Sequence, residues 1–513
     1  MHEGLAIVDW AVVGFYLALV VAVGLYFSGR IKSASDFFLA GKTLPWWAAA
    51  LSIVAAETSA VTYIGTPRLA YQGDWWFLQF VLGLVLGRIV LALLLVRVFY
   101  RRDILTVYGI IEHRFGNAAR VTAAFLFLLG RVVASGVRLY AGCLAVQVAT
   151  GFPLSVSVLI LGGFSTLYTL AGGIRAVVWT DVLLGLTFMA GGVVSALSIG
   201  ASLPDGILSG PLLAEKTTIL HPGWNLSSSN CLLAGLAGGF VLTLATHGTD
   251  QDVVQKILTC RNSRSGSLSI LGSAVLILPL MALFLTIGTL LFFFYRTHQV
   301  PYELPRQLDH IFPVFIVREL PRGFAGFVMA GLFAAATSSF ASVLNALAST
   351  TLSDLYKPIL AALGRSPSER HFFRFSRSAA LFWAVVLLGV ALAFQGSSDS
   401  VLNVALSVLT YFYGALLGAF LLASLTARGS GPSVVTGMLL SVPAVLLLQL
   451  RQFLEMPSLA PDSLRALIVR LPDGFTRAVL DHVPAVAWPW WIIVGTTVTF
   501  GVGYLGTRRP AAE

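Results

Sequence analysis

The stretch Ala55-Ala56-Glu57-Thr58-Ser59-Ala60 places a carboxylate and two hydroxyl groups in the middle of a long apolar run. A second stretch, Thr243-Leu244-Ala245-Thr246-His247-Gly248-Thr249-Asp250-Gln251, interrupts a later apolar run in a similar way. Taken singly, each stretch has two interpretations. Small and hydroxylated residues can simply let helices pack closely, or they can mark helices that are broken around a binding site.

The composition around these stretches is that of a membrane protein. The chain has 513 residues, of which 57% are hydrophobic and 11% are charged, whereas a soluble domain carries about 25% charged residues. So few charges cannot cover a water-exposed surface, and apolar runs recur from end to end, so we expect a single transmembrane domain over residues 1–513. The net charge of +10 lies in short loops and does not indicate nucleic-acid binding.

The apolar runs are long enough to cross a bilayer as helices, which requires about 20 residues for about 30 Å of hydrocarbon. Their number predicts an all-α polytopic protein with about 13 transmembrane helices. The runs are too long and too continuous for the strands of a membrane barrel. Their centres are Ala18, Ala60, Leu86, Val133, Leu161, Thr187, Thr243, Leu280, Ala335, Val385, Gly414, Leu440 and Thr497.

Basic residues favour alternate loops, which predicts the orientation of the chain through the positive-inside rule. We expect the N-terminus outside and the C-terminus in the cytoplasm, in the plasma membrane, which for a bacterium is the inner membrane. The long loops 203–229, 298–322 and 451–487 then lie outside. The residues assigned to the inside are Arg30, Lys32, Lys42, Arg101, Arg102, Arg114, Arg175, Lys256, Arg261, Arg264, Lys357, Arg365, Arg370, Arg374, Arg377, Arg428, Arg508 and Arg509.

The two interrupted runs are five spans apart, which makes them corresponding elements of two five-helix halves. This arrangement is typical of secondary transporters built from inverted repeats, whose binding site lies at the midplane between broken helices. The spacing predicts a first repeat over 45–202 and a second, inverted repeat over 233–424. Flanking helices are expected over 8–29, 432–450 and 489–507.

Five ordered stretches resemble the sodium:solute symporter family. They are 35–48 (S-D-F-F-L-A-G-K, then L-P-W-W-A), 55–65, 168–181 (Y-T-L-A-G-G-I-R-A-V-V-W-T-D), 248–256 (G-T-D-Q-D-V-V-Q-K) and 334–354. The resemblance implies a leucine-transporter-type fold of five plus five helices with flanking helices. It also implies alternating access driven by sodium.

A sodium site is indicated by the hydroxyl groups gathered in the ninth run. Neutral hydroxyls and freed backbone carbonyls supply the oxygen ligands that a hard cation requires without burying an unpaired anion. The alternative is that the serines bond back to their own helix. By resemblance, the primary sodium would be held by the carbonyls of Ala55, Thr58 and Ala335 and the hydroxyls of Ser338 and Ser339.

A second sodium is an open question in this sequence. Some relatives hold one with a carboxylate that matches Asp181, and Ser342 would assist here. However, Ala341 stands where relatives with two sodium ions carry another serine, which favours one ion. Asp181 has a second interpretation as an acidic residue placed favourably near a helix N-terminus.

Arginines inside a membrane are costly and are therefore functional candidates. Arg131 and Arg138 lie seven residues apart, on one helix face, with Ser135 between them, and Arg88 lies in another run. A guanidinium group stays charged and binds a carboxylate through two hydrogen bonds. Either Arg131 or Arg138 could receive a solute carboxylate, or each could be a structural partner of a carboxylate or carbonyl within the protein.

The remaining solute candidates are polar residues along the expected lining helices. Sugar-transporting relatives carry a glutamate early in the third span and a lysine in the eighth, where this chain has Trp75-Trp76-Phe77 and Val275. A neutral hexose is therefore less favoured. The candidates are Ser59, Thr62, Gln79, Thr243, Thr246, His247 and Asn403.

The sequence thus predicts a sodium-coupled symporter that imports a small polar solute, with a carboxylate favoured and a sugar or other neutral solute as the alternative. We do not expect an enzyme, because the eight histidines are scattered and form no catalytic set. No filter-like repeat indicates a channel, and no appended region indicates a sensor. The expected partners are Na+, the solute and the bilayer, without nucleic acid or an obligate protein partner.

Overall fold

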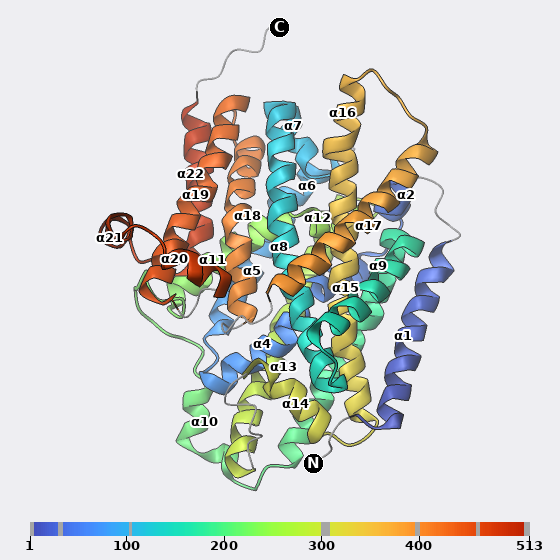
Figure 1. Cartoon of the computed structure of the whole chain (residues 1–513), viewed down its shortest axis with the longest axis vertical. Coiled ribbons are helices and arrows are strands. Elements are labelled where there is room, and N and C mark those ends of the chain that lie inside the picture. Colours follow the sequence, from blue (N-terminus) through green and yellow to red (C-terminus); the bar gives the residue numbers. More distant parts are fainter. Residues whose placement is uncertain are drawn as a thin grey trace.

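The computed structural model describes residues 5–28, 34–101, 105–298, 308–394, 401–457 and 462–506. Within these ranges the chain is helical, and its only β pairing is an isolated bridge between Leu44 and Cys260. The first helix begins at one end of the long axis and the last helix finishes at the other (Figure 1). The all-α fold class is confirmed.

The helices that carry the thirteen predicted centres are α1 (Ile7–Ser28), α3 (Trp46–Glu57) with α4 (Ala60–Gln72), α5 (Phe77–Val90), α8 (Asn117–Thr150), α9 (Leu154–Ala201), α11 (Leu232–Gly248) with α12 (Gln251–Leu258), α13 (Ser263–Thr297), α15 (Phe324–Thr350), α17 (Glu369–Ala393), α18 (Val401–Leu425), α19 (Gly431–Glu455) and α22 (Trp488–Leu505). The π-helix η2 (Leu91–Leu95) and α6 (Val96–Tyr100) continue α5, and the π-helix η5 (Thr351–Tyr356) and α16 (Lys357–Ala362) continue α15.

Shorter helices connect these spans. They are α2 (Ala34–Leu39), η1 (Ala40–Lys42), α7 (Tyr108–Phe115), η3 (Ile207–Ser209), α10 (Pro211–Lys216), η4 (Leu308–His310), α14 (Ile311–Arg318), α20 (Asp462–Ile468) and α21 (Asp473–His482).

Every predicted centre lies within a helix, although the helices differ in length. In the described part of the chain, eight helices are long and apolar enough to cross a membrane, or ten if each bent pair forms one span. Two predicted spans share the 48-residue α9, which is kinked at Gly173. This glycine has φ +57°, and a Cβ there would meet the Phe37 carbonyl oxygen at 2.8 Å, so the kink requires glycine.

Both predicted interruptions are breaks in the structure. The axes of α3 and α4 differ by 63°, and those of α11 and α12 differ by 62°. At the first break Ser59 is extended, with φ −84° and ψ −179°. At the second break Asp250 is extended and its carboxylate accepts the backbone N–H of Asp252 at 2.9 Å, which caps α12.

The breaks lie against α15, which runs through the centre of the molecule. Every residue of α15 from Val328 to Thr350 is buried. This helix packs against α1, α3, α8, α9, α12 and α17. Because α15 touches both α3 and α12, it brings the hydroxyl-rich sequence of the ninth run to both breaks.

At the end where α1 begins, Lys216 of α10 closes the last turn of α4. Its Nζ donates to the carbonyls of Tyr71 at 2.7 Å and Gly73 at 2.8 Å. It also lies 4.0 Å from the centre of the Phe292 ring. Burial lowers the pKa of Lys216 from its ordinary value. A cation at this position offsets the negative end of the helix dipole.

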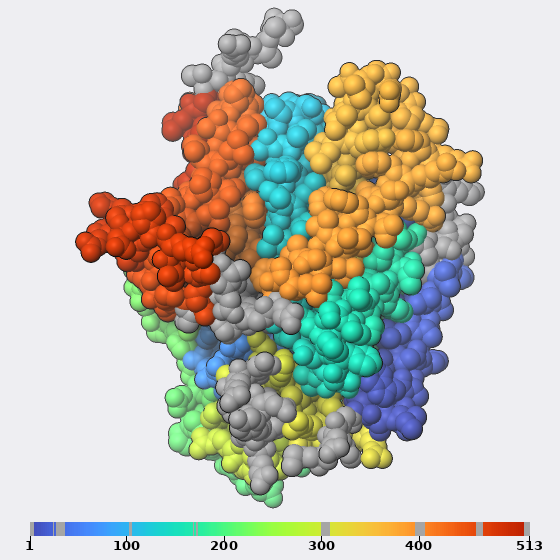
Figure 2. Space-filling view, viewed as in Figure 1, coloured from blue at the N-terminus to red at the C-terminus, as the bar shows by residue number. Residues whose placement is uncertain are grey.

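At the opposite end, Arg120 ties α8 to the segment after α15. Its Nε lies 2.7 Å from Oδ1 of Asp354, which also accepts the Thr106 hydroxyl at 2.8 Å. The Asp354 carboxylate is fully buried. Arg120 and Thr106 line a cavity together with Glu112 and Lys357, among others. Figure 2 shows the surface of the start of α8, in cyan, near that of α16 at this end.

Removing Arg120 should destabilise the protein, because it leaves the buried Asp354 carboxylate without its cation. We expect Arg120→Met to cost about 3–5 kcal/mol and Arg120→Lys to cost less, measured by thermal unfolding in detergent. Arg114→Met is the matched control, since Arg114 makes one long hydrogen bond of 3.4 Å to the Arg428 carbonyl. Equal shifts for Arg120→Met and Arg114→Met would contradict this role.

Candidate solute and sodium site

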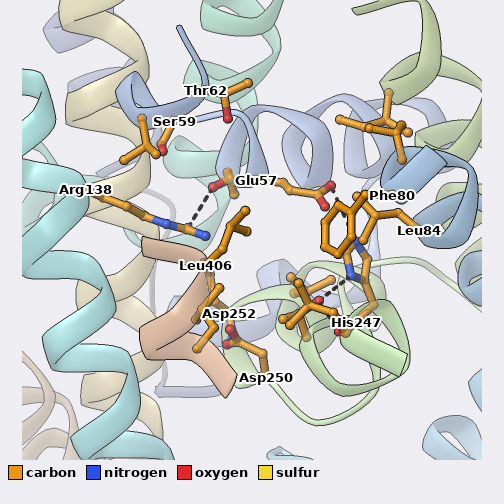
Figure 3. A pocket seen from close by; sticks show the side chains of 18 of the residues that line it. Glu57, Ser59, Thr62, Phe80, Leu84, Arg138, His247, Asp250, Asp252 and Leu406 are labelled. Atoms are coloured by element: carbon orange, nitrogen blue, oxygen red, sulfur yellow. Dashed lines mark hydrogen bonds and ion pairs between the residues drawn. The ribbon is translucent and has the colours of Figure 1, made fainter. Parts of the chain in front are cut away.

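A cavity lies between the two breaks. Its volume is about 90 Å³, and it is partly open to solvent. Figure 3 shows polar side chains from both broken spans around it, with Phe80 and Leu84 on one wall. The lining residues are Ala56, Glu57, Ser59, Val61, Thr62, Phe77, Phe80, Val81, Leu84, Arg131, Arg138, Leu242, Thr246, His247, Asp250, Asp252, Val253, Ile277, Met281, Leu406 and Leu409.

Arg131 has partners of its own within the protein. Its Nη1 lies 2.8 Å from Oδ2 of Asp250, and its Nη2 bonds the carboxylate of Asp252. The Tyr413 hydroxyl donates to the same Asp250 oxygen at 2.7 Å. All of these side chains are buried. Arg131 therefore offsets the negative charge of the two carboxylates at the α11–α12 break.

Arg88 plays the equivalent part at the α3–α4 break. Its Nη2 is paired with the Glu57 carboxylate, and its Nη1 donates to the Ser273 carbonyl at 2.8 Å. The Arg88 side chain is fully buried. Each break thus has one arginine bound to a carboxylate that comes from the broken segment itself.

Arg138 differs from these two arginines. Its Nη1 donates to the carbonyl of Ala56 at 3.2 Å, and its side chain points into the cavity toward the end of α3 (Figure 3). Among the residues that the structure describes, no carboxylate lies within 4.0 Å of its nitrogen atoms, the distance that defines an ion pair. Arg138 is therefore the guanidinium group available to a ligand.

Apart from Gln79, the other predicted solute residues divide into three groups. Ser59, Thr62, Thr246 and His247 line the cavity together with the two arginines. Ser135 and Thr243 are buried but are not part of the lining. The side chain of Asn403 lies outside the described residues.

The Gln79 side chain forms hydrogen bonds with the loop between α10 and α11. Its Oε1 accepts the backbone N–H of His221 at 2.9 Å, and its Nε2 donates to the carbonyl of Asn230 at 3.0 Å. Gln79 is not among the cavity-lining residues. The structure therefore gives it a role in holding the loop onto α5.

Three lining carboxylates were not predicted as site residues. Glu57, Asp250 and Asp252 all border the cavity. Glu57 and Asp250 belong to the two interrupted stretches, and Asp252 follows directly. Their position next to the breaks, where backbone N–H groups and arginines need anionic partners, is the signal that identifies them.

The residues predicted to hold sodium come from two elements that meet. Ala55 and Thr58 are buried at the end of α3, and the other three lie in α15. The Ser339 hydroxyl donates across the interface to the Ala56 carbonyl at 3.5 Å. The hydroxyl of Ser338 donates to Asp181 rather than to its own helix. Both serines therefore present their oxygens between helices, as a cation site requires.

Asp181 lies beside these serines, in α9. Its Oδ1 accepts the Ser338 hydroxyl, and its Oδ2 accepts the hydroxyl of Ser52. The Nζ of Lys256 lies 3.4 Å from the same Oδ2 atom. Ser342, expected beside Asp181, donates instead to Asp252.

The assignment of Lys256 to a cytoplasmic loop was wrong. Lys256 is fully buried in α12, where its Nζ contacts Asp181, Asp252 and the Ser52 carbonyl. The break after α11 turns the chain, so α12 continues within the protein core instead of leaving the membrane. Counting Lys256 as a loop cation took no account of that turn.

The chain matches the family model of the "Sodium:solute symporter family" over residues 37–440. It belongs to this family. Among its relatives is the sodium/sialic acid symporter SiaT of Proteus mirabilis, 30% identical over 86% of this chain and 89% of that protein. Another is the sodium-coupled monocarboxylate transporter 1 of Xenopus laevis, 28% identical over 84% of this chain and 70% of that protein.

A solved structure shares the whole fold. It is described as the substrate-bound outward-open state of a Na+-coupled sialic acid symporter with a novel Na+ site. The TM-score is 0.82 at 25% identity, and the match covers 98% of this chain and 97% of that one. The leucine-transporter-type fold is confirmed, and the protein is a sodium:solute symporter of the membrane rather than an enzyme.

Ser339→Ala should weaken sodium binding, because it removes one oxygen from the interface between α3 and α15. Loss of one such interaction costs about 1 kcal/mol, so the sodium concentration for half-maximal transport should rise about five-fold. Ser349→Ala is the control, since the Ser349 hydroxyl donates to the carbonyl of Ala346 in its own helix at 2.9 Å. Indistinguishable values for both variants would exclude Ser339 as a ligand.

Proposed function

We propose that this symporter imports a small polar organic solute that carries a carboxylate group. The observation that carries the proposal is Arg138, a cavity-lining guanidinium group with a carbonyl as its protein partner. A cation in a membrane interior is costly unless it is paired. A planar carboxylate on the solute would supply the missing partner through two hydrogen bonds.

The names of the relatives agree with this class of solute. Sialic acid and monocarboxylates both carry a carboxylate group, and transporters of both are similar to this chain. In our proposal the hydroxyls of Ser59 and Thr62 and the imidazole of His247 bind polar groups on the rest of the solute. Phe80 and Leu84 provide an apolar wall, as most small-molecule sites do.

The sodium site proposed here uses the carbonyls of Ala55, Thr58 and Ala335 and the hydroxyls of Ser338 and Ser339. In this proposal, sodium and solute binding are coupled because their ligands include adjacent carbonyls in the chain. The Ala55 carbonyl would bind the ion, and the next carbonyl, that of Ala56, accepts from Arg138. An ion that fixes the end of α3 against α15 therefore also fixes the carbonyl that orients the solute receptor, so each ligand favours binding of the other.

The proposed orientation places the start of α1 outside and the end of α22 in the cytoplasm of the cell that makes the protein. The basic loop residues support it through the positive-inside rule. We also propose residues 45–202 and 233–424 as the two repeats. Their support is the position of the bent pairs, each of which is the first span of its half.

Truncation of Arg138 should abolish recognition of the carboxylate. We expect Arg138→Ala to reduce solute affinity by about 30-fold or more, equivalent to about 2–5 kcal/mol. Arg138→Lys should give an intermediate affinity, because lysine keeps the charge but loses the planar pair of donors. The measurement is solute binding to purified protein, with candidate carboxylates such as sialic acid and short monocarboxylates.

Two controls make this test specific. A neutral amide analogue should bind the unmodified protein poorly and be little affected by Arg138→Ala. Arg131→Ala should lower the unfolding temperature instead, because it leaves Asp250 and Asp252 without their shared cation. If the amide binds as well as the acid, the solute is not recognised through its carboxylate.

A further inference from the structure

Lys256 is a fully buried ammonium group at the centre of the bundle. Its Nζ lies 3.4 Å from Asp181 Oδ2 and 3.6 Å from Asp252 Oδ1, and it donates to the Ser52 carbonyl at 3.3 Å. These partners come from α9, α12 and α3. The surroundings of the nitrogen are therefore carboxylate and carbonyl oxygens, which are also the ligands of a bound hard cation.

The carboxylates of Asp181 and Asp252 beside Lys256 also accept hydrogen bonds from other donors. Asp181 accepts both the Ser52 and the Ser338 hydroxyls. Asp252 is paired with Arg131 and accepts the Ser342 hydroxyl. Without Lys256, Asp181 would have only neutral donors, and a negative charge would remain buried.

The oxygen set around Asp181 is also incomplete for a second ion. Ser342, which would assist Asp181, is turned toward Asp252. Position 341 is alanine and offers no side-chain oxygen. The cation nearest to Asp181 in the described chain is Lys256 itself, and another cation on the same carboxylate would be repelled by it at close range.

We propose that the ammonium group of Lys256 takes the place of a second sodium ion at Asp181, so that this symporter binds one sodium ion. The inference deepens the proposed function and rests on its primary sodium site. Asp181 then acts as a positioning residue. Its carboxylate accepts the hydrogen bond of the Ser338 hydroxyl, so the lone pairs of the Ser338 oxygen remain free for the primary ion.

The test counts sodium ions in the purified full-length protein without any solute. The midpoint of thermal unfolding is followed as sodium replaces choline at constant ionic strength. At saturating sodium, the stabilisation rises with the logarithm of the concentration in proportion to the number of ions bound. The unmodified protein should give the slope for one ion, and a slope for two ions would overturn the proposal.

Three variants test the role of the lysine. Lys256→Met should double the slope, because the vacated position at Asp181 accepts a second sodium ion. Lys256→Arg keeps a cation and should retain the slope for one ion. The double variant Asp181→Asn with Lys256→Met removes one charge of each sign and should also bind one ion. An unchanged slope in Lys256→Met would overturn the proposal.

If Lys256→Met is too unstable to purify in choline, its behaviour in sodium is the readout. A variant that folds in sodium but not in choline supports an ion in place of the ammonium group. A variant that folds in neither, while the double variant folds, would show that sodium cannot replace Lys256. Because sodium alone is the probe, failure of the carboxylate proposal would leave this ion count unaffected.

Discussion

The carboxylate of Asp250 makes the break between α11 and α12 tolerable inside a membrane. A broken helix leaves backbone N–H groups without partners, and lipid offers none. Asp250 accepts the N–H of Asp252 and thereby caps α12. The buried charge of this cap requires a cation, which α8 supplies as Arg131, and a further hydrogen bond, which α18 supplies as Tyr413. One cap therefore fixes three neighbouring elements.

The two breaks are symmetric in position but differ in chemistry. At the second break, Arg131 and Lys256 are bound to carboxylates of the broken segment, so its charges are satisfied internally. At the first break, Ser59 has no side-chain cap hydrogen bond, and the Ala56 carbonyl faces Arg138 and Ser339. Both breaks thus contain a buried arginine–carboxylate pair, but the first also presents a carbonyl oxygen to a guanidinium group that has no carboxylate partner among the described residues. We infer that ligands are exchanged at the first break and that the second is its rigid support.

The sequence predicted the fold more completely than the site. Each predicted run centre lies in a helix, and polar residues at Glu57 and Asp250 located both breaks, because both signals are local in the chain. The partners of the arginines were not local. Arg131 and Arg138 are indistinguishable by spacing on α8, yet one binds two carboxylates and the other binds a carbonyl. Lys256 was misplaced for the same reason, since its burial depends on the direction of α12 after a bend that sequence locates but does not orient.

The buried charges that line the cavity or pair beside it give a reason for coupling. Glu57, Asp181, Asp250 and Asp252 are four carboxylates, and Arg88, Arg131, Arg138 and Lys256 are four cations, so these described groups sum to zero. A carboxylate solute alone would make this buried group net negative, and a sodium ion alone would make it net positive. Both changes are unfavourable in a medium of low dielectric constant. One anion and one sodium ion together restore neutrality, so each lowers the cost of binding the other. A second sodium ion would disturb this balance, whereas the covalently attached charge of Lys256 is already part of it.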